Sequence, residues 1–174
     1  MRNLCILCCL LLSAFSIKAQ NRLETDAKGR TLLLGKFDES ILEHGAFAQW
    51  YVPYKSNYKP KPAVMTNLKP MIKGRRFELF MGTWCGDSKR GVPQLLKVFE
   101  GLEVSDDQLE MIAVDYRGNM YKKSPGKEEV GKNITRVPTL IIYEGETEIG
   151  RIIERPHKNW EADMLALLSK KGNL

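Results

Sequence analysis

The order of apolar and polar segments in the amino-acid sequence predicts an α/β protein with a mixed central sheet flanked by helices. Short apolar runs typical of buried strands occur at residues 77–81 and 109–114. A third run, at residues 137–143, is followed by a turn and a returning strand at residues 148–153. Helical or polar segments separate these runs, and a chain that alternates in this way and then ends in a hairpin and a helix favours a mixed sheet.

The length and composition indicate one domain with short additions. The chain has 174 residues, of which 43% are hydrophobic and 28% are charged. Its formal net charge of +6 is spread along the chain and forms no basic stripe, which argues against nucleic-acid binding. We expect a signal peptide at residues 1–19, an N-terminal extension at residues 20–60 and the main domain at residues 61–174.

The N-terminal segment has the pattern of a secretory signal peptide. Arg2 gives a positive start, residues 4–15 are almost wholly apolar, and small residues ending in Ala19 precede Gln20. The apolar run is shorter than the roughly 20 residues that a membrane-spanning helix needs. We therefore expect cleavage after residue 19 and an exported protein, periplasmic or secreted, with the bacterial cell envelope favoured and no stable membrane span. An uncleaved N-terminal anchor is the alternative.

Removal of this segment leaves a single cysteine. Cys5, Cys8 and Cys9 belong to the predicted signal peptide, so the mature chain keeps Cys85. Cysteines of exported proteins are usually paired, because the compartment is oxidising. A leftover cysteine therefore suggests an intermolecular partner or a reactive thiol, and a buried, inert cysteine is the alternative.

The segment before the main domain is predicted to contain one short strand and two helices. A strand at residues 31–34 and a helix at residues 41–50 precede a stretch with three prolines, residues 52–62, which predicts a loop. A second helix is expected at residues 63–72, and Pro70 argues for an early end to it.

Three further helices are expected after the first apolar strand. One begins at Cys85 or Gly86 and runs to residue 99, with a kink at Pro93 and a stop at Gly101. A short helix is predicted at residues 127–132. The last, at residues 160–171, follows Asn159, whose side chain can cap it.

The position of Cys85 gives it a chemical role. It follows a buried strand and a short turn and opens a helix, whose first N–H groups are unpaired and carry about half a positive charge. A thiolate is stabilised at such a site, and the thiolate is the nucleophile in disulfide exchange. We therefore expect Cys85 to be a nucleophile.

With these elements in place, the chain resembles the thioredoxin superfamily. The matching residues are Trp84-Cys85-Gly86, the helix proline Pro93, and Val137-Pro138-Thr139, which opens a strand about fifty residues after the cysteine. The downstream hairpin and final helix also fit, so that the resemblance covers roughly residues 60–170. It implies a thioredoxin fold for the main domain.

The resemblance implies roles for residues on both sides of the site. Cys85 matches the attacking cysteine, and Trp84 matches an aromatic residue that shields it. Pro138 matches a proline that is cis in the family and faces the cysteine, which leaves the backbone of Val137 free to pair with an extended substrate. Gly86, together with the neighbouring Asp87, completes the expected substrate-binding set. An ordinary proline at the start of a strand is the alternative for Pro138.

The sequence departs from the family where a second thiol is expected. Ser88 replaces the resolving cysteine, and Asp87 stands where a proline is common. A buried acid of the family is replaced by Leu79, and Glu78 is one residue away, on the opposite side of the strand. We expect Ser88 to be part of the catalytic site, where its hydroxyl can donate to the thiolate, or else to be a polar residue of the first helical turn.

These features predict a thiol-disulfide exchange protein of the reductase or isomerase kind, which acts through mixed disulfides and an external or substrate thiol. The alternative is a redox-inactive thioredoxin-fold module that binds peptides. Expected partners are disulfide- or thiol-bearing proteins or small thiols. No cofactor motif or metal spacing is found, since His44 and His157 are far apart in the sequence. The aromatic stretch Trp50, Tyr51, Tyr54 and Tyr58 favours packing onto the domain over docking of a client.

Overall fold

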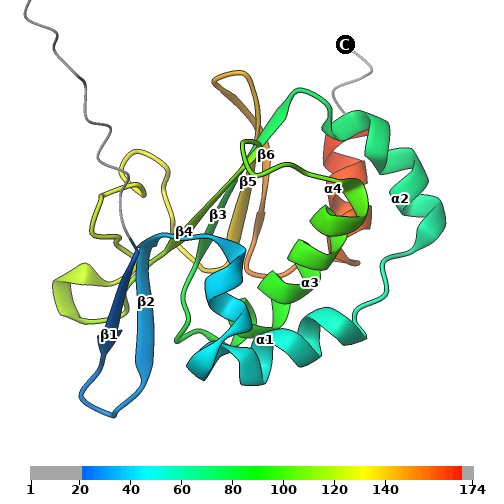
Figure 1. Ribbon diagram of the computed structural model, residues 1–174. Coiled ribbons are helices and arrows are strands. Elements are labelled where there is room, and N and C mark those ends of the chain that lie inside the picture. Colours follow the sequence, from blue (N-terminus) through cyan, green and yellow to red (C-terminus); the bar gives the residue numbers. More distant parts are fainter. Residues whose placement is uncertain (1–20, 170–174) are drawn as a thin grey trace, which may run out of the picture.

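A computed structural model describes residues 21–169, which form one six-stranded sheet covered by helices (Figure 1). The predicted signal peptide, its three cysteines and residues 170–171 of the expected last helix lie outside this range. The strands are β1 (Arg22–Thr25), β2 (Thr31–Lys36), β3 (Arg75–Met81), β4 (Leu109–Ala113), β5 (Thr139–Glu144) and β6 (Thr147–Ile153). The α-helices are α1 (Gly45–Asn57), α2 (Pro62–Leu68), α3 (Gly86–Leu102) and α4 (Trp160–Ser169).

The sheet is mixed, as the sequence predicts. Its strand order is β1-β2-β4-β3-β5-β6. Only β3 and β4 run parallel, and the other neighbours pair antiparallel. The central position of β3 explains why residues 77–81 are all buried, because such a strand is covered on both faces.

The two faces of the sheet are covered differently. All four helices contribute to one large apolar cluster on the face that carries Leu79. A smaller cluster lies on the other face around Phe80, where the segment between β4 and β5 replaces a helix layer as the cover. Figure 1 shows this segment, in yellow, on the opposite side of the sheet from α3. None of the helices in residues 21–169 is long and apolar enough to cross a membrane.

The N-terminal region is more ordered than its sequence predicts. The structure adds a strand, β1, that pairs with β2 to form a hairpin at the edge of the sheet. The predicted loop at residues 52–62 is wrong over its first half, because α1 continues through Pro53 to Asn57. Packing of α1 against α3 compensates for the backbone donor that Pro53 lacks. Of the aromatic stretch expected to pack onto the domain, Tyr51 is fully buried there, whereas Tyr54 is exposed.

The remaining helices differ from the predictions mainly at their ends. The helix predicted at residues 41–50 begins only at Gly45, after a 3-10 turn at Glu39–Glu43. Helix α2 ends at Leu68 and is followed by a second 3-10 turn, Lys69–Ile72, which contains Pro70. Helix α3 passes through Gly101 and ends at Leu102, before Glu103, which has a left-handed backbone. The helix predicted at residues 127–132 is absent. Two residues there, Lys127 and Gly131, have positive φ angles, which an α-helix cannot accommodate.

The C-terminal elements follow the predictions. Strands β5 and β6 form the expected hairpin, and the Asn159 side chain accepts a hydrogen bond from the backbone N–H of Ala162 at 2.9 Å, which caps α4.

A buried carboxylate ties the long segment between β4 and β5 to the sheet. Glu78 is only 2% exposed and accepts hydrogen bonds from Lys132 of that segment, from Arg76 at 2.5 Å and from the Tyr143 hydroxyl at 3.0 Å. Burial alone raises the pKa of Glu78, but the hydrogen bonds from Lys132 and Arg76 outweigh it and leave the pKa below its ordinary value. Burial, followed by the Glu78 charge, raises the pKa of Tyr143 to about 12. As predicted, Glu78 and Leu79 face opposite sides of the sheet.

We expect Glu78→Gln to lower the free energy of unfolding at pH 7 by about 1–3 kcal/mol, because it weakens charged hydrogen bonds at a buried site. Since folding depresses the pKa of Glu78, its contribution is present above the ordinary value of 4.5 and is lost as pH falls through the folded-state pKa. The variant should therefore lose less stability than the wild type between pH 7 and pH 3. Denaturant unfolding at several pH values measures this, with the exposed Glu43→Gln as control. Equal pH dependence in Glu78→Gln and wild type would contradict the assignment.

Candidate functional site

A tight turn between β3 and α3 places Cys85 at the start of the helix, as the sequence predicts. The backbone N–H of Cys85 donates to the carbonyl of Gly82 at 2.9 Å, and the Cys85 carbonyl accepts from Lys89 in the first helical turn at 3.0 Å. Cys85 itself has extended backbone angles and is the residue before the first helical position. Its thiol is therefore next to the unpaired N–H groups of α3, where negative charge is favoured.

Only glycine fits at the beginning of this turn. A Cβ atom on Gly82 would lie 2.5 Å from the Trp84 ring, so the ring folds directly back over the glycine. The Gly82 N–H donates to the Ser88 hydroxyl at 3.2 Å, and Ser88 is fully buried. This hydrogen bond gives Ser88 a role in holding the turn. Donation from Ser88 to a Cys85 thiolate stays a prediction.

The structure brings Cys85 and Val137 together, although they are far apart in the sequence. The Cys85 thiol donates to the carbonyl of Val137 across 3.2 Å. The Val137–Pro138 peptide bond is cis, which confirms the expectation drawn from the resemblance. The thiol is half-buried, and its residue packs with Trp84 against the apolar cluster around Phe80. It is thus oriented by protein contacts and still reachable from solvent.

Helix α3 lies close to Pro138, the residue before β5. A Cβ atom on Gly91 would lie 3.1 Å from the Trp160 ring and 3.7 Å from the Pro138 ring. This close approach of α3, α4 and the start of β5 accounts for a glycine in a helix interior, where it costs about 1 kcal/mol relative to alanine. The sequence reasoning missed Gly91, and its helical position was the signal that could have identified it.

An aromatic cluster borders the thiol on one side. The Trp84 indole N–H donates to the carbonyl of Val114 at 2.8 Å, and the Trp84 ring contacts Tyr116 and Tyr121, with ring centres 5.8 and 5.9 Å away. Tyr121 is 52% exposed. The cluster therefore presents apolar surface beside Cys85, where a substrate side chain can pack. The sequence reasoning identified Trp84 and missed both tyrosines.

The β1–β2 hairpin supports this aromatic cluster. The hydroxyl of Tyr116 donates to the Asp26 carboxylate at 2.8 Å and accepts from the Arg30 guanidinium at 2.9 Å. Hydrogen bonds from the Arg30 backbone, and then from the side chains of Arg30 and Tyr116, hold the pKa of Asp26 well below its usual range, against the effect of burial. The region predicted as an N-terminal extension thus contributes to the surroundings of the candidate site.

The charge of Asp87 is compensated from another part of the chain. Arg155, in the loop between β6 and α4, places its Nε at 2.9 Å and a terminal nitrogen at 2.8 Å from one Asp87 carboxylate oxygen. This pair could not be recognised from the sequence, because 68 residues separate its members. Gly86, which completes the expected substrate-binding set, opens the helix between Cys85 and Asp87, and a Cβ atom there would contact nothing.

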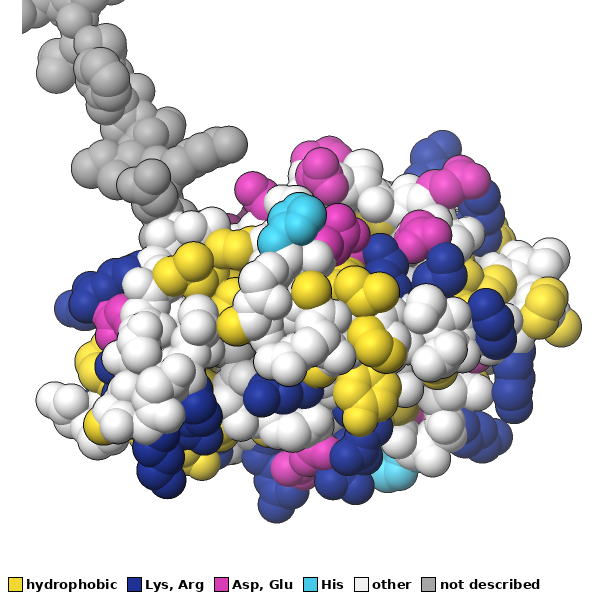
Figure 2. All heavy atoms as spheres, turned by 60° about the horizontal axis from the view of Figure 1, so that its bottom comes forward, with side chains coloured by type: hydrophobic (Ala, Val, Ile, Leu, Met, Phe, Trp, Pro, Cys, Tyr) yellow, Lys and Arg dark blue, Asp and Glu magenta, His cyan; other side chains and the backbone are white. Residues whose placement is uncertain are grey.

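The chemistry of the site rests on one thiol. Cys85 is the only cysteine in residues 21–169, and within the same residues no group of three or more His, Cys, Asp or Glu side chains could hold a metal ion. Figure 2 shows the face at the bottom of Figure 1, toward which the N-terminal end of α3 is directed, with small apolar groups among scattered Lys and Arg side chains. An oriented, accessible thiol at a helix start can attack an electrophilic sulfur that approaches from solvent.

No protein-family model matches the sequence, and no curated protein matches it. Among solved structures, the chain is similar to a protein of unknown function from Pseudomonas aeruginosa, with a TM-score of 0.52 and 18% identity over 79% of this chain and 93% of that one. An HIV epitope scaffold matches with a TM-score of 0.49 and 18% identity, over 80% of this chain and 94% of that one. At this identity the likeness to the Pseudomonas protein concerns the fold alone, an α/β arrangement with a mixed sheet.

We expect the Asp87–Arg155 pair to set the reactivity of Cys85. Asp87→Asn removes a negative charge from the first turn of α3 and leaves Arg155 uncompensated, which favours the thiolate and should accelerate alkylation at pH 7 about two- to fivefold. Arg155→Gln leaves Asp87 uncompensated and should slow the reaction by a similar factor. Iodoacetamide labelling followed by mass spectrometry measures both rates. The distant Lys73→Gln serves as control, and a change of the same sign in both variants would exclude this electrostatic role.

Proposed function

We propose that the protein is an exported, thioredoxin-like thiol-disulfide exchange protein that acts through Cys85. The observation that carries the proposal is the contact between the Cys85 thiol at the start of α3 and the carbonyl of Val137, next to Pro138. Three features support it further: the order β3-α3-β4 followed by the β5–β6 hairpin and α4, the aromatic side chain of Trp84 beside the thiol, and the buried Ser88 in place of a second cysteine.

The first step is attack of the Cys85 thiolate on one sulfur of a client disulfide. A bond forms between Cys85 Sγ and that sulfur, the client S–S bond breaks, and the second client sulfur leaves as a thiolate that takes up a proton. The product is a mixed disulfide. The thiol proton of Cys85 goes to solvent before the attack, and the N-terminal end of α3 favours the resulting negative charge.

The second step needs a thiol from outside the protein. A client thiol or a small-molecule thiol attacks the client sulfur of the mixed disulfide, Cys85 leaves as a thiolate, and a new disulfide forms between the attacking thiol and the client. When the attacking thiol belongs to the client, the net result is isomerisation with no change in the number of disulfides. When it is a small thiol, the client emerges as a mixed disulfide with that molecule, and a second such thiol completes its reduction.

The proposed setting and partners follow from the sequence. Export to an oxidising compartment, periplasmic or extracellular, would bring Cys85 together with disulfide-bearing proteins and small thiols. The competing function is a redox-inactive module that holds extended peptides beside Pro138. It shares the surface around Trp84 and Val137 with the proposed function but does not need the thiol, so a cysteine variant separates the two.

We expect the mature protein to form a mixed disulfide with a peptide that contains an intramolecular disulfide, and Cys85→Ala to form none. Mass spectrometry after acid quenching detects the adduct, and its decay on addition of a small thiol measures the second step. Glu43→Gln, at an exposed position far from the thiol in the chain, should behave as the wild type. Binding of the reduced peptide that survives in Cys85→Ala, without any adduct in the wild type, would favour the peptide-binding module.

Ser88→Cys should convert the reaction into a two-thiol one. Residues three apart in a helical turn are neighbours, so a thiol at position 88 can attack the mixed disulfide and release the client as a thiol. The expected products are an internally oxidised protein and a reduced client peptide, with a much shorter-lived adduct than in the wild type. Gel-shift analysis after thiol alkylation distinguishes the two outcomes, and Ser56→Cys controls for the presence of a second thiol elsewhere. An unchanged adduct lifetime in Ser88→Cys would argue against this geometry.

A further inference from the structure

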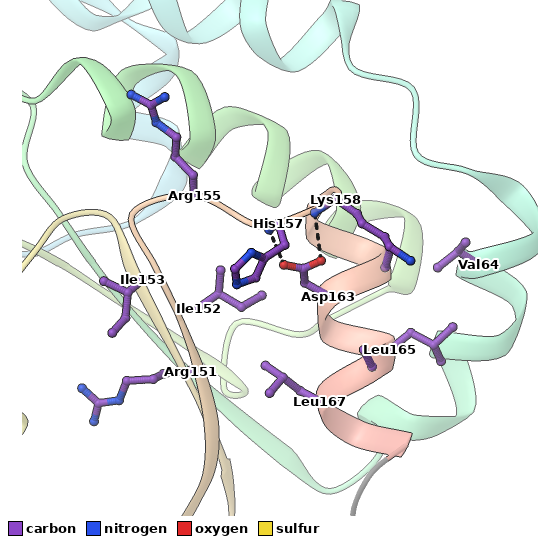
Figure 3. A pocket seen from close by; sticks show the side chains of 12 residues that line it. Val64, Arg151, Ile152, Ile153, Arg155, His157, Lys158, Asp163, Leu165 and Leu167 are labelled. Carbon is purple, nitrogen blue, oxygen red and sulfur yellow. Dashed lines mark hydrogen bonds between the residues drawn. The ribbon is translucent and has the colours of Figure 1, made fainter.

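A cavity of about 730 Å³ lies beside the edge of the sheet, away from the contacts that Cys85 makes (Figure 3). Its apolar lining comes from Ile152 and Ile153 of β6, from Leu165 and Leu167 of α4, and from Val64 of α2. In Figure 3, α4 stands between Val64 and the strand that carries Ile152, so the hollow extends over the solvent-facing side of this helix. We call this region the β6–α4 groove.

Helix α4 contributes apolar side chains both to the core and to the groove. Trp160, Met164 and Leu168 face the core and are buried, as expected for a helix that covers a sheet. Leu165 and Leu167 are half-buried and pack against the edge of the core cluster, with α2 and β6 as the neighbours of α4. Ala166 is exposed, so the groove is open to solvent at this position of the helix.

The groove also runs along an unpaired strand edge. Strand β6 is the last strand of the sheet, and within residues 21–169 no further strand pairs with its outer edge. Alternate backbone N–H and C=O groups on that edge are therefore open to another chain. An edge strand next to an apolar groove is the arrangement that binds an extended peptide by strand addition, with backbone hydrogen bonds along the edge and side chains in the groove.

The rim of the groove favours acidic side chains. Arg151, Arg155 and Lys158 line it together with a single acid, Asp163, whose carboxylate accepts the backbone N–H groups of His157 at 2.6 Å and Lys158 at 3.2 Å. Arg151 and Arg155 are paired with carboxylates outside the groove, whereas the Lys158 ammonium has no partner in the described part of the chain. Of the described residues on the rim, Lys158 is therefore the cation that is free to meet a carboxylate of a bound segment.

The groove adjoins the Cys85 site through two contacts. The backbone N–H of Glu154, just after β6, donates to the carbonyl of Pro138 at 2.6 Å. The next residue, Arg155, lines the groove and also forms the ion pair with Asp87 in the first turn of α3. Arg155 therefore links the rim of the groove to the first turn of α3, two residues from Cys85.

We infer that the β6–α4 groove binds an extended client segment in which apolar side chains alternate with polar ones and are flanked by Asp or Glu. Backbone groups of β6 hold the segment, the apolar side chains enter between β6 and α4, and the carboxylates meet Lys158 and the neighbouring arginines. The inference rests on the proposed function in one respect, namely that the bound segment belongs to a client that reacts with Cys85. Binding itself needs no thiol.

The test uses a fluorescein-labelled peptide without cysteine, Asp-Leu-Thr-Val-Ser-Leu-Glu, and the mature protein, with binding followed by fluorescence anisotropy. We expect saturable binding that weakens about tenfold in Lys158→Glu, where attraction of a carboxylate becomes repulsion. Ala166→Glu, at an exposed helix position, should weaken it at least as much, because it places a charge in the apolar groove. A peptide with lysine in place of both acidic residues should not bind.

Lys73→Glu provides the matched control, because it makes the same change in net charge at an exposed position outside the groove. It should bind the acidic peptide as the wild type does. Equal weakening in Lys73→Glu and Lys158→Glu, or no binding to the wild type, would overturn the inference. So would binding of the protein to vesicles of anionic lipid in competition with the peptide, since the surface would then be a membrane contact.

Failure of this inference can be separated from failure of the proposed function. Cys85→Ala should bind the acidic peptide with unchanged affinity. A disulfide peptide that carries the acidic segment should form its adduct with wild-type protein faster than one without it, and Lys158→Glu should remove the difference. Peptide binding without any adduct would support the inference about the groove and contradict the proposed exchange activity. Adduct formation at the same rate with and without the acidic segment would contradict the inference about the groove and support the exchange activity.

Discussion

The close contact between Gly82 and the Trp84 ring is the constraint on which the rest of the site depends. A Cβ atom at Gly82 would collide with the Trp84 ring, so glycine at this position lets the chain turn back directly after β3, and Cys85 then precedes the first helical residue. The buried Ser88 hydroxyl holds the same turn by accepting the Gly82 N–H. Ser88 thus occupies the position of a second thiol in the sequence and supports the turn in the structure. Cys85 can therefore face Val137 only because strand, turn and helix are fixed together.

Much of this arrangement was predictable from the sequence, because it depends on local signals. The apolar runs of β3, β4 and β5, the cysteine at a helix start and the capping Asn159 are each recognisable without knowledge of distant residues. The ends of helices and the path through Pro53 were not, because packing of α1 on α3 overrides the preference of proline for a loop.

The parts of the site that sequence reasoning missed are contacts between distant segments. Arg155 meets Asp87, Gly91 approaches Trp160, and Tyr116 joins the β1–β2 hairpin to the aromatic cluster. The fold brings each pair together: the loop after β6 lies beside the start of α3, α3 packs against α4, and β2 of the hairpin is next to β4. A pattern of residue types along one sequence contains no information about such partners. Gly91 is the exception, because a glycine in a helix interior lowers stability and so indicates a position where another element comes close.

The β1–β2 hairpin also affects the risk of aggregation while the chain folds. Strand β2 covers the side of β4 that faces away from β3, and without it β4 would present an open row of backbone donors and acceptors. The hairpin precedes β4 by more than seventy residues in the chain and is made before it, so this pairing joins an earlier and a later part of the chain. Until β2 pairs with β4, the partly folded molecule has an unpaired strand edge that can pair with other copies of the chain. The hairpin is thus a safeguard against aggregation as well as a support for the thiol's surroundings.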